Sequence, residues 1–223
     1  MASADNLARL NSIHYITNKH GTGKKAQQKI NKRLEGTDYE LGKLKRGVAS
    51  FKNKKDGHVA VSVKGTDIKS TSDLISDIKL GLGFSGHDKQ FKSRQKEIKK
   101  IYKDNPNVDK YLSGHSLGGS IVTSALVNSK SIRDNTKKAH VYNPGYTPAF
   151  HDELSKNLTK DDKKELNNKI THHHVKGDLI SDALNAKRIG KLKKYDEKSI
   201  NPLTKHSLST VIDKLEGDKE EKL

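Results

Sequence analysis

The sequence contains no cysteine, and aromatic residues make up only 5% of its 223 residues. The absence of cysteine excludes disulfide bonds, thiolate catalysis and cysteine-bound metals, but it leaves the redox environment open. No apolar run approaches the ~20 residues that a membrane-spanning helix needs. The first 15 residues lack the apolar centre of a secretory signal, so we expect a cytoplasmic or a virion and host-intracellular location.

Hydrophobic residues are also scarce, at 31%, whereas charged residues make up 32%. A chain of this length can form one α/β domain, so we expect a compact core beneath a densely charged surface. Lys and Arg number 44 against 27 Asp and Glu, which gives a formal net charge of +17. Such a charge attracts nucleic acid or an anionic membrane, although a solvated lysine-rich surface accounts for it equally well. No nucleic-acid motif accompanies the lysines and few aromatics could stack on bases, so we do not expect nucleic-acid binding.

Strand and helix patterns alternate along the chain. Strand patterns occupy residues 58–67, 108–114, 138–145 and 169–178, and helical patterns occupy residues 1–35, 71–83, 87–106, 117–129, 151–168 and 201–215. The alternation predicts an α/β fold, a mostly parallel sheet with helices on both faces in a compact single domain. We expect residues 1–50 to form a helical region packed on a domain of residues 51–215, with a disordered tail at 216–223.

The stretch NKHGTGKK, residues 18–25, shares glycines and a lysine with phosphate-binding loops. Two positions of that motif are not met, because Asn18 replaces the first glycine and Lys25 replaces the Ser or Thr that binds magnesium. No strand pattern precedes the stretch either. We therefore interpret it as a turn.

Residues 114–119 read Gly-His-Ser-Leu-Gly-Gly between a predicted strand and a predicted helix. A nucleophile elbow needs this order, because a sharp turn must expose the serine in a strained backbone conformation. Gly114 and Gly118 lack Cβ atoms, so the strand and the helix can approach each other closely. A bare Gly-x-Ser-x-Gly pattern also arises by chance, but this context predicts that Ser116 is a nucleophile.

These residues resemble the class 3 lipase family, the fungal-type lipases of the α/β-hydrolase fold, whose elbow has the same six residues. VKGTD (63–67) is similar to the end of an earlier strand in that family, and VYNPGYTP (141–148) is similar to the strand and turn after the elbow helix. DLISDIKLG (73–81) and GHDKQF (86–91) resemble it more weakly. The resemblance covers roughly residues 55–212. It also implies a lid at residues 68–86, whose apolar side chains fit a core-facing helix equally well.

On this fold an acid and then a base follow the serine along the chain. The acid should lie just past a later strand, where the sequence has Asp178, and the resemblance points to the same residue. Asp182, one helical turn further on, is the alternative. Only one of the 11 histidines follows Asp178, so the order of the chain selects His206 as the base.

When Ser116 attacks a carbonyl group, the carbonyl oxygen becomes negatively charged. The backbone N–H groups of Leu117 and Thr66 would bind this oxyanion, with the Thr66 hydroxyl as a further donor. His115 precedes the serine directly, so its side chain points away and we interpret it as structural support.

The run HHH at residues 172–174 raises the question of a metal site. Alternate residues of a strand share a face, so only His172 and His174 could chelate together. No Asp, Glu or Cys stands at a spacing that would complete the site. We therefore expect no metal and no cofactor, and interpret the run as a strand with half-buried histidines.

Taken together, these residues predict a serine hydrolase that cleaves carboxylic esters of lipids through an acyl-enzyme. The choice of a lipid substrate, an acylglycerol or a phospholipid, rests on the resemblance. We also expect peripheral association with an anionic membrane surface, while the sequence gives no indication of the oligomeric state. Two other interpretations stay open: a catalytically silent α/β-hydrolase scaffold, and a cationic protein that binds membranes or nucleic acid.

Overall fold

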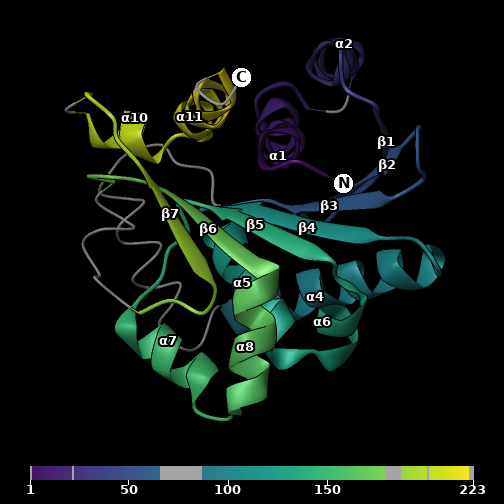
Figure 1. Cartoon of the computed structure of the whole chain (residues 1–223). Helices are drawn as coiled ribbons and strands as arrows, with labels where there is room; N and C mark the ends of the chain where they lie inside the picture. The colour runs from purple at the N-terminus through teal and green to yellow at the C-terminus, as the bar shows by residue number, and fades with distance from the viewer. Residues whose placement is uncertain (1, 22, 66–86, 179–186, 200, 221–223) are drawn as a thin grey trace.

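The computed structural model describes residues 2–21, 23–65, 87–178, 187–199 and 201–220. At its centre is a seven-stranded sheet whose strands lie side by side in chain order (Figure 1). The strands are β1 (Tyr39–Lys45), β2 (Val48–Asn53), β3 (Val59–Val63), β4 (Lys110–His115), β5 (Lys138–Tyr142), β6 (Ile170–Val175) and β7 (Lys191–Tyr195). The pairs β1–β2 and β2–β3 are antiparallel, and the strands from β3 to β7 are parallel. The predicted mostly parallel sheet is thus confirmed.

Helices cover both faces of this sheet (Figure 1). One face carries α1 (Ala4–His20), α2 (Lys24–Leu34), α10 (Pro202–His206) and α11 (Leu208–Glu220). The other carries α4 (His87–Asp104), α5 (Leu117–Asn128), α6 (Lys130–Asn135), α7 (Pro148–Ser155) and α8 (Lys160–Lys169). None of the helices in the described parts of the chain is long and apolar enough to span a bilayer.

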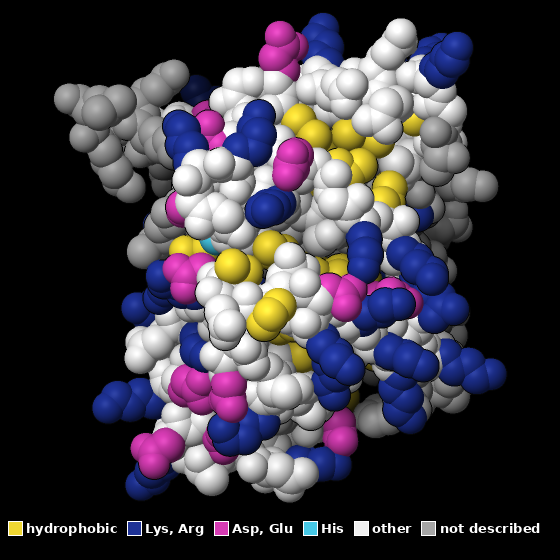
Figure 2. Space-filling model, turned by 90° about the vertical axis from the view of Figure 1, so that its right-hand side faces the viewer, with side chains coloured by type: hydrophobic (Ala, Val, Ile, Leu, Met, Phe, Trp, Pro, Cys, Tyr) yellow, Lys and Arg dark blue, Asp and Glu magenta, His cyan; other side chains and the backbone are white. Residues whose placement is uncertain are grey.

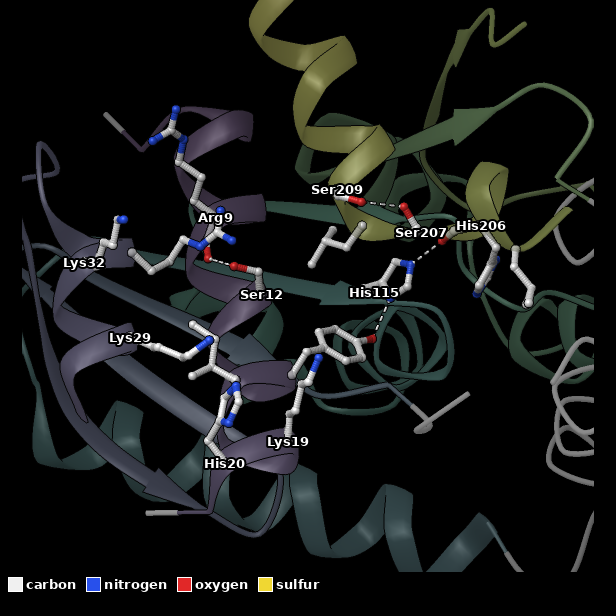
Figure 3. A pocket seen from close by; sticks show the side chains of 15 residues that line it. Arg9, Ser12, Lys19, His20, Lys29, Lys32, His115, His206, Ser207 and Ser209 are labelled. Atoms are coloured by element: carbon white, nitrogen blue, oxygen red, sulfur yellow. Dashed lines mark hydrogen bonds between the residues drawn. The ribbon is translucent and has the colours of Figure 1, made fainter. Parts of the chain in front are cut away.

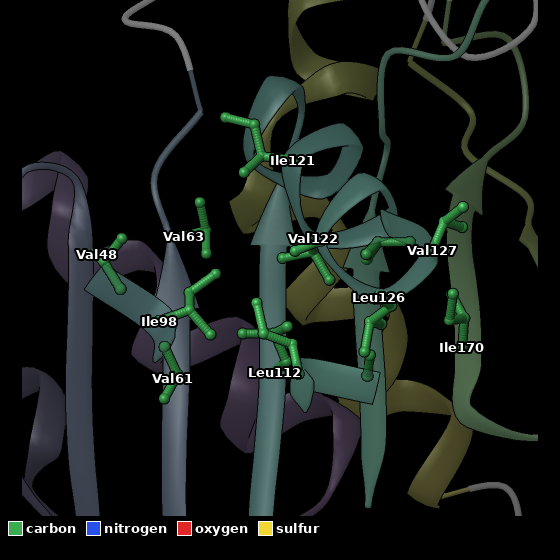
Figure 4. Close-up of a cluster of buried hydrophobic side chains, with 14 of the residues drawn as sticks. Val48, Val61, Val63, Ile98, Leu112, Ile121, Val122, Leu126, Val127 and Ile170 are labelled. Atoms are coloured by element: carbon green, nitrogen blue, oxygen red, sulfur yellow. The ribbon is translucent and has the colours of Figure 1, made fainter. Parts of the chain in front are cut away.

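The two faces enclose separate hydrophobic cores. On the α5 face, Ile121, Val122 and Leu126 of α5 pack on aliphatic side chains of the strands, among them Val61 and Leu112 (Figure 4). The opposite core joins side chains of α1 and α11 to the tyrosines and the phenylalanine of the sheet. Every residue of β3 and β4 is buried, as expected for strands that are covered on both faces.

Several elements differ from those expected from the sequence. The region 1–50 is not wholly helical, because residues 39–53 form the hairpin β1–β2 at one edge of the sheet. The helical pattern at 151–168 is two helices, since Thr147 and Thr159 each cap a new N-terminus with a side-chain hydrogen bond. The strand β7 was not predicted. Residues 216–220, expected as part of a disordered tail, continue α11.

The carboxyl ends of the parallel strands meet at one edge of the sheet. Gly65 lies just beyond β3, Ser116 follows β4, Asn143 follows β5 and Asp178 lies just beyond β6. Segments far apart in the sequence are therefore brought together at this edge, where ligands of open α/β sheets bind. Residues 66–86, which contain the expected lid, lie outside the described residues.

Candidate active site

Ser116 lies in a sharp turn between the end of β4 and the first residue of α5. Its backbone has φ 55° and ψ −129°, a conformation that side-chain-bearing residues rarely adopt. The flanking glycines make this turn sterically accessible: a Cβ at Gly114 would overlap the backbone of Gly118, and a Cβ at Gly118 would overlap Val63. The strand, turn and helix expected around the serine are thus present. The packing around the turn offsets the conformational free energy of the strained Ser116 backbone.

The end of β3 lies against this turn. A Cβ at Gly65 would come within 3.2 Å of the Ser116 Cβ, so the two backbones approach as closely as a glycine allows. Thr66, expected as an oxyanion donor, follows Gly65 directly but lies outside the described residues. Leu117, the other expected donor, opens α5, and the first N–H groups of a helix have no partner within that helix.

Asp178 and His206 form a buried pair at the same edge. The His206 Nδ1 lies 3.0 Å and 2.9 Å from the two carboxylate oxygens of Asp178, and both side chains are 1% exposed. These residues are 28 positions apart, and the crossover that contains β7 fits between them. Asp182, the alternative acid, lies outside the described residues. An Nδ1–H that donates to the carboxylate leaves a lone pair on the opposite ring nitrogen, Nε2.

Two polar atoms of this site have no hydrogen-bond partner within the described parts of the chain. They are the hydroxyl oxygen of Ser116 and the Nε2 of His206, and both are fully buried. A buried polar atom without a partner costs about 1–3 kcal/mol, so such atoms are rare outside functional sites.

His115 connects the serine turn to the histidine. Its Nε2 donates to the backbone carbonyl of His206 at 2.7 Å, and the centres of the two rings are 5.0 Å apart. Its Nδ1 lies 2.6 Å from the Tyr15 hydroxyl of α1 (Figure 3). Burial, followed by the nearby His206, lowers the pKa of His115 to about 3, so the ring is neutral and Nδ1 accepts from Tyr15. The structural role expected for His115 thus consists of holding the His206 segment next to Ser116.

Asn143 makes a second connection that sequence reasoning missed. It is fully buried with φ 40°; its Nδ2 donates to the carbonyl of Lys205 at 2.9 Å, and its Oδ1 accepts from the N–H of Val175 at 2.9 Å. The signal in the sequence was an asparagine at the end of a strand, since asparagine tolerates positive φ better than most residues. The backbone just before His206 is thereby tied to the ends of β5 and β6.

The histidines at 172–174 are fully buried, and not half-buried as expected, because β6 lies inside the sheet and helices cover both of its faces. The His172 Nε2 donates to the carbonyl of Ile189 at 2.9 Å. His173 lies 2.8 Å from both the His140 Nδ1 and the Tyr195 hydroxyl. In the described ranges, no group of three or more His, Asp or Glu side chains is arranged to hold a metal ion.

Comparison with known proteins adds independent information. The model of the family Lipase (class 3) matches residues 59–186, which is more than half of the chain. A search of curated proteins finds no match.

Among solved structures, a fungal lipase superposes with a TM-score of 0.51 at 16% identity, covering 93% of this chain and 83% of that one. The MDLA N225Q mutant from Penicillium cyclopium gives a TM-score of 0.49 at 16% identity, covering 88% and 79%. Lipase II from Rhizopus niveus gives 0.47 at 13% identity, covering 79% and 71%. The first of these likenesses agrees with the α/β-hydrolase fold, and the family match is independent of it. The chain therefore belongs to the class 3 lipases, a family of carboxylic ester hydrolases.

Proposed function

We propose that the protein hydrolyses a carboxylic ester of a lipid, an acylglycerol or a phospholipid, through an acyl-enzyme on Ser116. One observation carries this proposal: the Ser116 hydroxyl and the His206 Nε2 are both buried without a hydrogen-bond partner in the described structure, while His115, the residue before Ser116, is bonded to the backbone of His206. A serine hydroxyl becomes an activated nucleophile when a nearby base accepts its proton, and the lone pair of the histidine Nε2 can serve as that base.

In the first half of the reaction, the His206 Nε2 takes the proton of the Ser116 hydroxyl while Oγ attacks the ester carbonyl carbon. Asp178 accepts the Nδ1–H bond, which fixes the tautomer and stabilises the imidazolium that forms. The tetrahedral intermediate collapses when the C–O bond to the alcohol breaks, and the imidazolium gives its proton to the departing alkoxide. The alcohol leaves and the acyl group remains on Ser116.

In the second half, water replaces the alcohol. His206 takes a proton from the water as it attacks the acyl carbon, and returns that proton to Oγ as the fatty acid leaves. The negatively charged oxygen of both intermediates would accept hydrogen bonds from the backbone N–H groups of Leu117, at the start of α5, and of Thr66. Removal of one such donor typically costs about 3 kcal/mol in the barrier.

We further propose that the protein associates peripherally with an anionic membrane. The net charge of +17 supports this, since each Lys or Arg near an anionic surface contributes about 1 kcal/mol of attraction. Lys and Arg side chains are spread over the face in Figure 2, with Asp and Glu among them.

The hydrolase proposal is tested with a fluorophosphonate probe and with Ser116→Ala. The Ser116 oxygen should displace fluoride from the probe, and peptide mapping should find the label on that residue. Ser116→Ala should fold and lose activity on a soluble ester by about 10⁴-fold or more. Ser113→Ala, which changes a buried serine of β4, the strand that leads into the turn at Ser116, serves as the matched control and should keep its activity. Labelling of another residue, or activity of Ser116→Ala within a hundredfold of the parent, would contradict the assignment.

A further inference from the structure

A groove of about 790 Å³ lies beside the contact of His115 with His206 (Figure 3). One wall is formed by α1 and α2, and the opposite wall by the corner between α10 and α11. His115 and His206 both line it, so the groove reaches the proposed catalytic histidine from the α1 face of the sheet. Its volume is within the range of pockets that hold small molecules.

The α1–α2 wall is strongly cationic. Lys19 of α1 and Lys29, Lys32 and Arg33 of α2 line the groove, and among the described residues no Asp or Glu does. The sequence explains this, because residues 6–34 contain seven Lys and Arg but no acidic residue. Figure 3 shows the side chains of Lys29 and Lys32 on the α2 side of the groove and that of Lys19 near the end of α1.

In the described parts of the chain, no carboxylate neutralises these cations. Some lysines elsewhere do pair with carboxylates, as in Lys43–Asp104 and Lys130–Asp134. By contrast, Lys19, Lys29, Lys32 and Arg33 make no ion pair within the described residues, while Arg9 of the same wall is bound to Glu216. Partial desolvation, together with nearby Lys29, Lys25 and Lys19, lowers the pKa of His20 at the edge of the groove, as expected in an uncompensated positive field.

The remaining lining is apolar or carries hydroxyl groups. Leu203 and Leu208 come from the α10–α11 corner, with the hydroxyls of Ser207 and Ser209 beside them. Ile16 and Tyr15 continue this lining along α1. The groove is therefore amphipathic, with cations along one side and aliphatic side chains near His206.

We propose that this groove binds the phosphate-bearing headgroup of an anionic phospholipid at a membrane surface. The unpaired cations of α1 and α2 would meet the phosphate, and the aliphatic side chains would contact the start of the acyl chains. This assignment rests on the proposed function and deepens it, because it names the class of lipid that is presented to His206. A nucleic-acid strand fits less well, since Tyr15 is the only Phe or Tyr among the described lining residues and its hydroxyl is bound to His115.

The test measures binding of the full chain, carrying Ser116→Ala so that lipid is not consumed, to sedimentable vesicles. Vesicles of phosphatidylglycerol should bind more protein than vesicles of phosphatidylcholine at the same salt. The triple variant Lys29→Gln, Lys32→Gln, Arg33→Gln should weaken binding to phosphatidylglycerol by about a hundredfold, because each charge contributes about 1 kcal/mol. The conservative triple Lys29→Arg, Lys32→Arg, Arg33→Lys should restore it.

The matched control removes the same charge elsewhere. Lys96, Lys99 and Lys103 are exposed on α4, which covers the opposite face of the sheet (Figure 1). Their triple substitution by Gln should change vesicle binding by less than about threefold, since charges beyond a Debye length of the bound surface are screened. Equal losses in the two triple variants would overturn the proposal, because attraction would then depend on net charge and not on the groove.

Three further measurements distinguish lipid binding from the binding of other ligands, and the groove proposal from the proposed hydrolase activity. If inorganic phosphate at millimolar levels binds the parent and not the groove triple, while both bind vesicles equally, the groove is a site for free phosphate and the lipid assignment fails. If a single-stranded oligonucleotide binds more tightly than vesicles, and the groove triple abolishes that binding, the ligand is a nucleic acid. Hydrolysis of a soluble ester by the parent chain is measured separately, so a protein that binds vesicles without esterase activity retains the groove and loses the proposed function.

Discussion

The two faces of the sheet are packed by different physical means. On the α5 face the core is mainly Val, Ile and Leu, and the helix α5 contributes an unbroken run of buried residues from Leu117 to Val127. On the α1 face, rings carry hydrogen bonds through the core: the His14 Nε2 donates to the carbonyl of Ser62, and the Tyr142 hydroxyl donates to the carbonyl of Ala4. The α5 side has such bonds too, because the His172 Nε2 donates to the carbonyl of Ile189 and the Tyr102 hydroxyl is bonded to Thr136, but aliphatic side chains predominate there.

The difference matters because the two kinds of packing constrain position differently. Aliphatic contacts are non-directional, so they stabilise a fold without fixing one atom against another. Hydrogen bonds of buried rings have set directions and leave costly unpaired groups when they are broken. The histidine proposed as the base is held from the α1 side, where Tyr15 contacts His115 and His115 contacts the carbonyl of His206.

The largest expected effect follows from the pKa values of the rings on the α1 face. Burial lowers the pKa of His14 and His140 to about 4 and of His115 to about 3, and it lowers that of His173 well below its usual value. Below the unfolded value of 6.5 the unfolded chain binds protons that the folded chain excludes, so stability is present above pH 6.5 and is lost as the pH falls. At pH 5.5 each ring costs about 1.4 kcal/mol, which makes a loss of several kcal/mol for the four.

Urea unfolding at pH 7.5, 6.5 and 5.5 measures this loss. The midpoint should fall moderately between the first two values and more steeply to the third. The ordinary pKa values of carboxyl groups are about 4, below this window, so the window is chosen for the histidines. A midpoint that stays constant down to pH 5.5 would mean that these rings become protonated without leaving their places.

The second prediction concerns the α5 face. Leu126 is fully buried in its aliphatic core, and Leu126→Ala should lower the free energy of unfolding by about 2–5 kcal/mol through lost transfer energy and a cavity. The loss should be the same at pH 7.5 and pH 6.5, because no titrating group is involved. Leu126→Met, which nearly conserves volume, should cost less than about 1.5 kcal/mol. A pH-dependent loss for Leu126→Ala would remove the distinction between the two faces.

Sequence reasoning was most successful where the signal is local. The strand β4, the turn at Ser116 and the helix α5 follow from apolar runs and glycines within a few residues. Asp178 followed from its place just past a strand pattern and from the family resemblance, and His206 from its order along the chain; the structure brings the two together. The catalytic roles of Ser116, Asp178 and His206 are proposals.

The elements that were missed lack such signals. The edge strands β1 and β7 are rich in exposed lysine, which suits an edge but does not resemble a strand pattern. The contact of Tyr15 with His115 joins residues 100 positions apart, and no local pattern indicates it. Interactions of this kind depend on the register of the whole sheet, so only the folded structure reveals them.

The smallest expected change in stability tests whether the directional contacts serve the site. Asn143→Gly keeps the positive φ accessible but leaves the carbonyl of Lys205 and the N–H of Val175 without their partner, which costs about 1–3 kcal/mol. Asn107 provides a matched control, because it also has a positive φ of 58° but is exposed in the loop before β4, at the opposite edge of the sheet. Asn107→Gly should leave the hydrolysis of a soluble ester unchanged. Asn143→Gly should lower kcat by about 10-fold to 100-fold with little change in KM, because a small misplacement of His206 weakens proton transfer more than binding. If kcat is kept while stability falls, Asn143 only stabilises the fold, and Tyr15 and His115 are sufficient to hold the base.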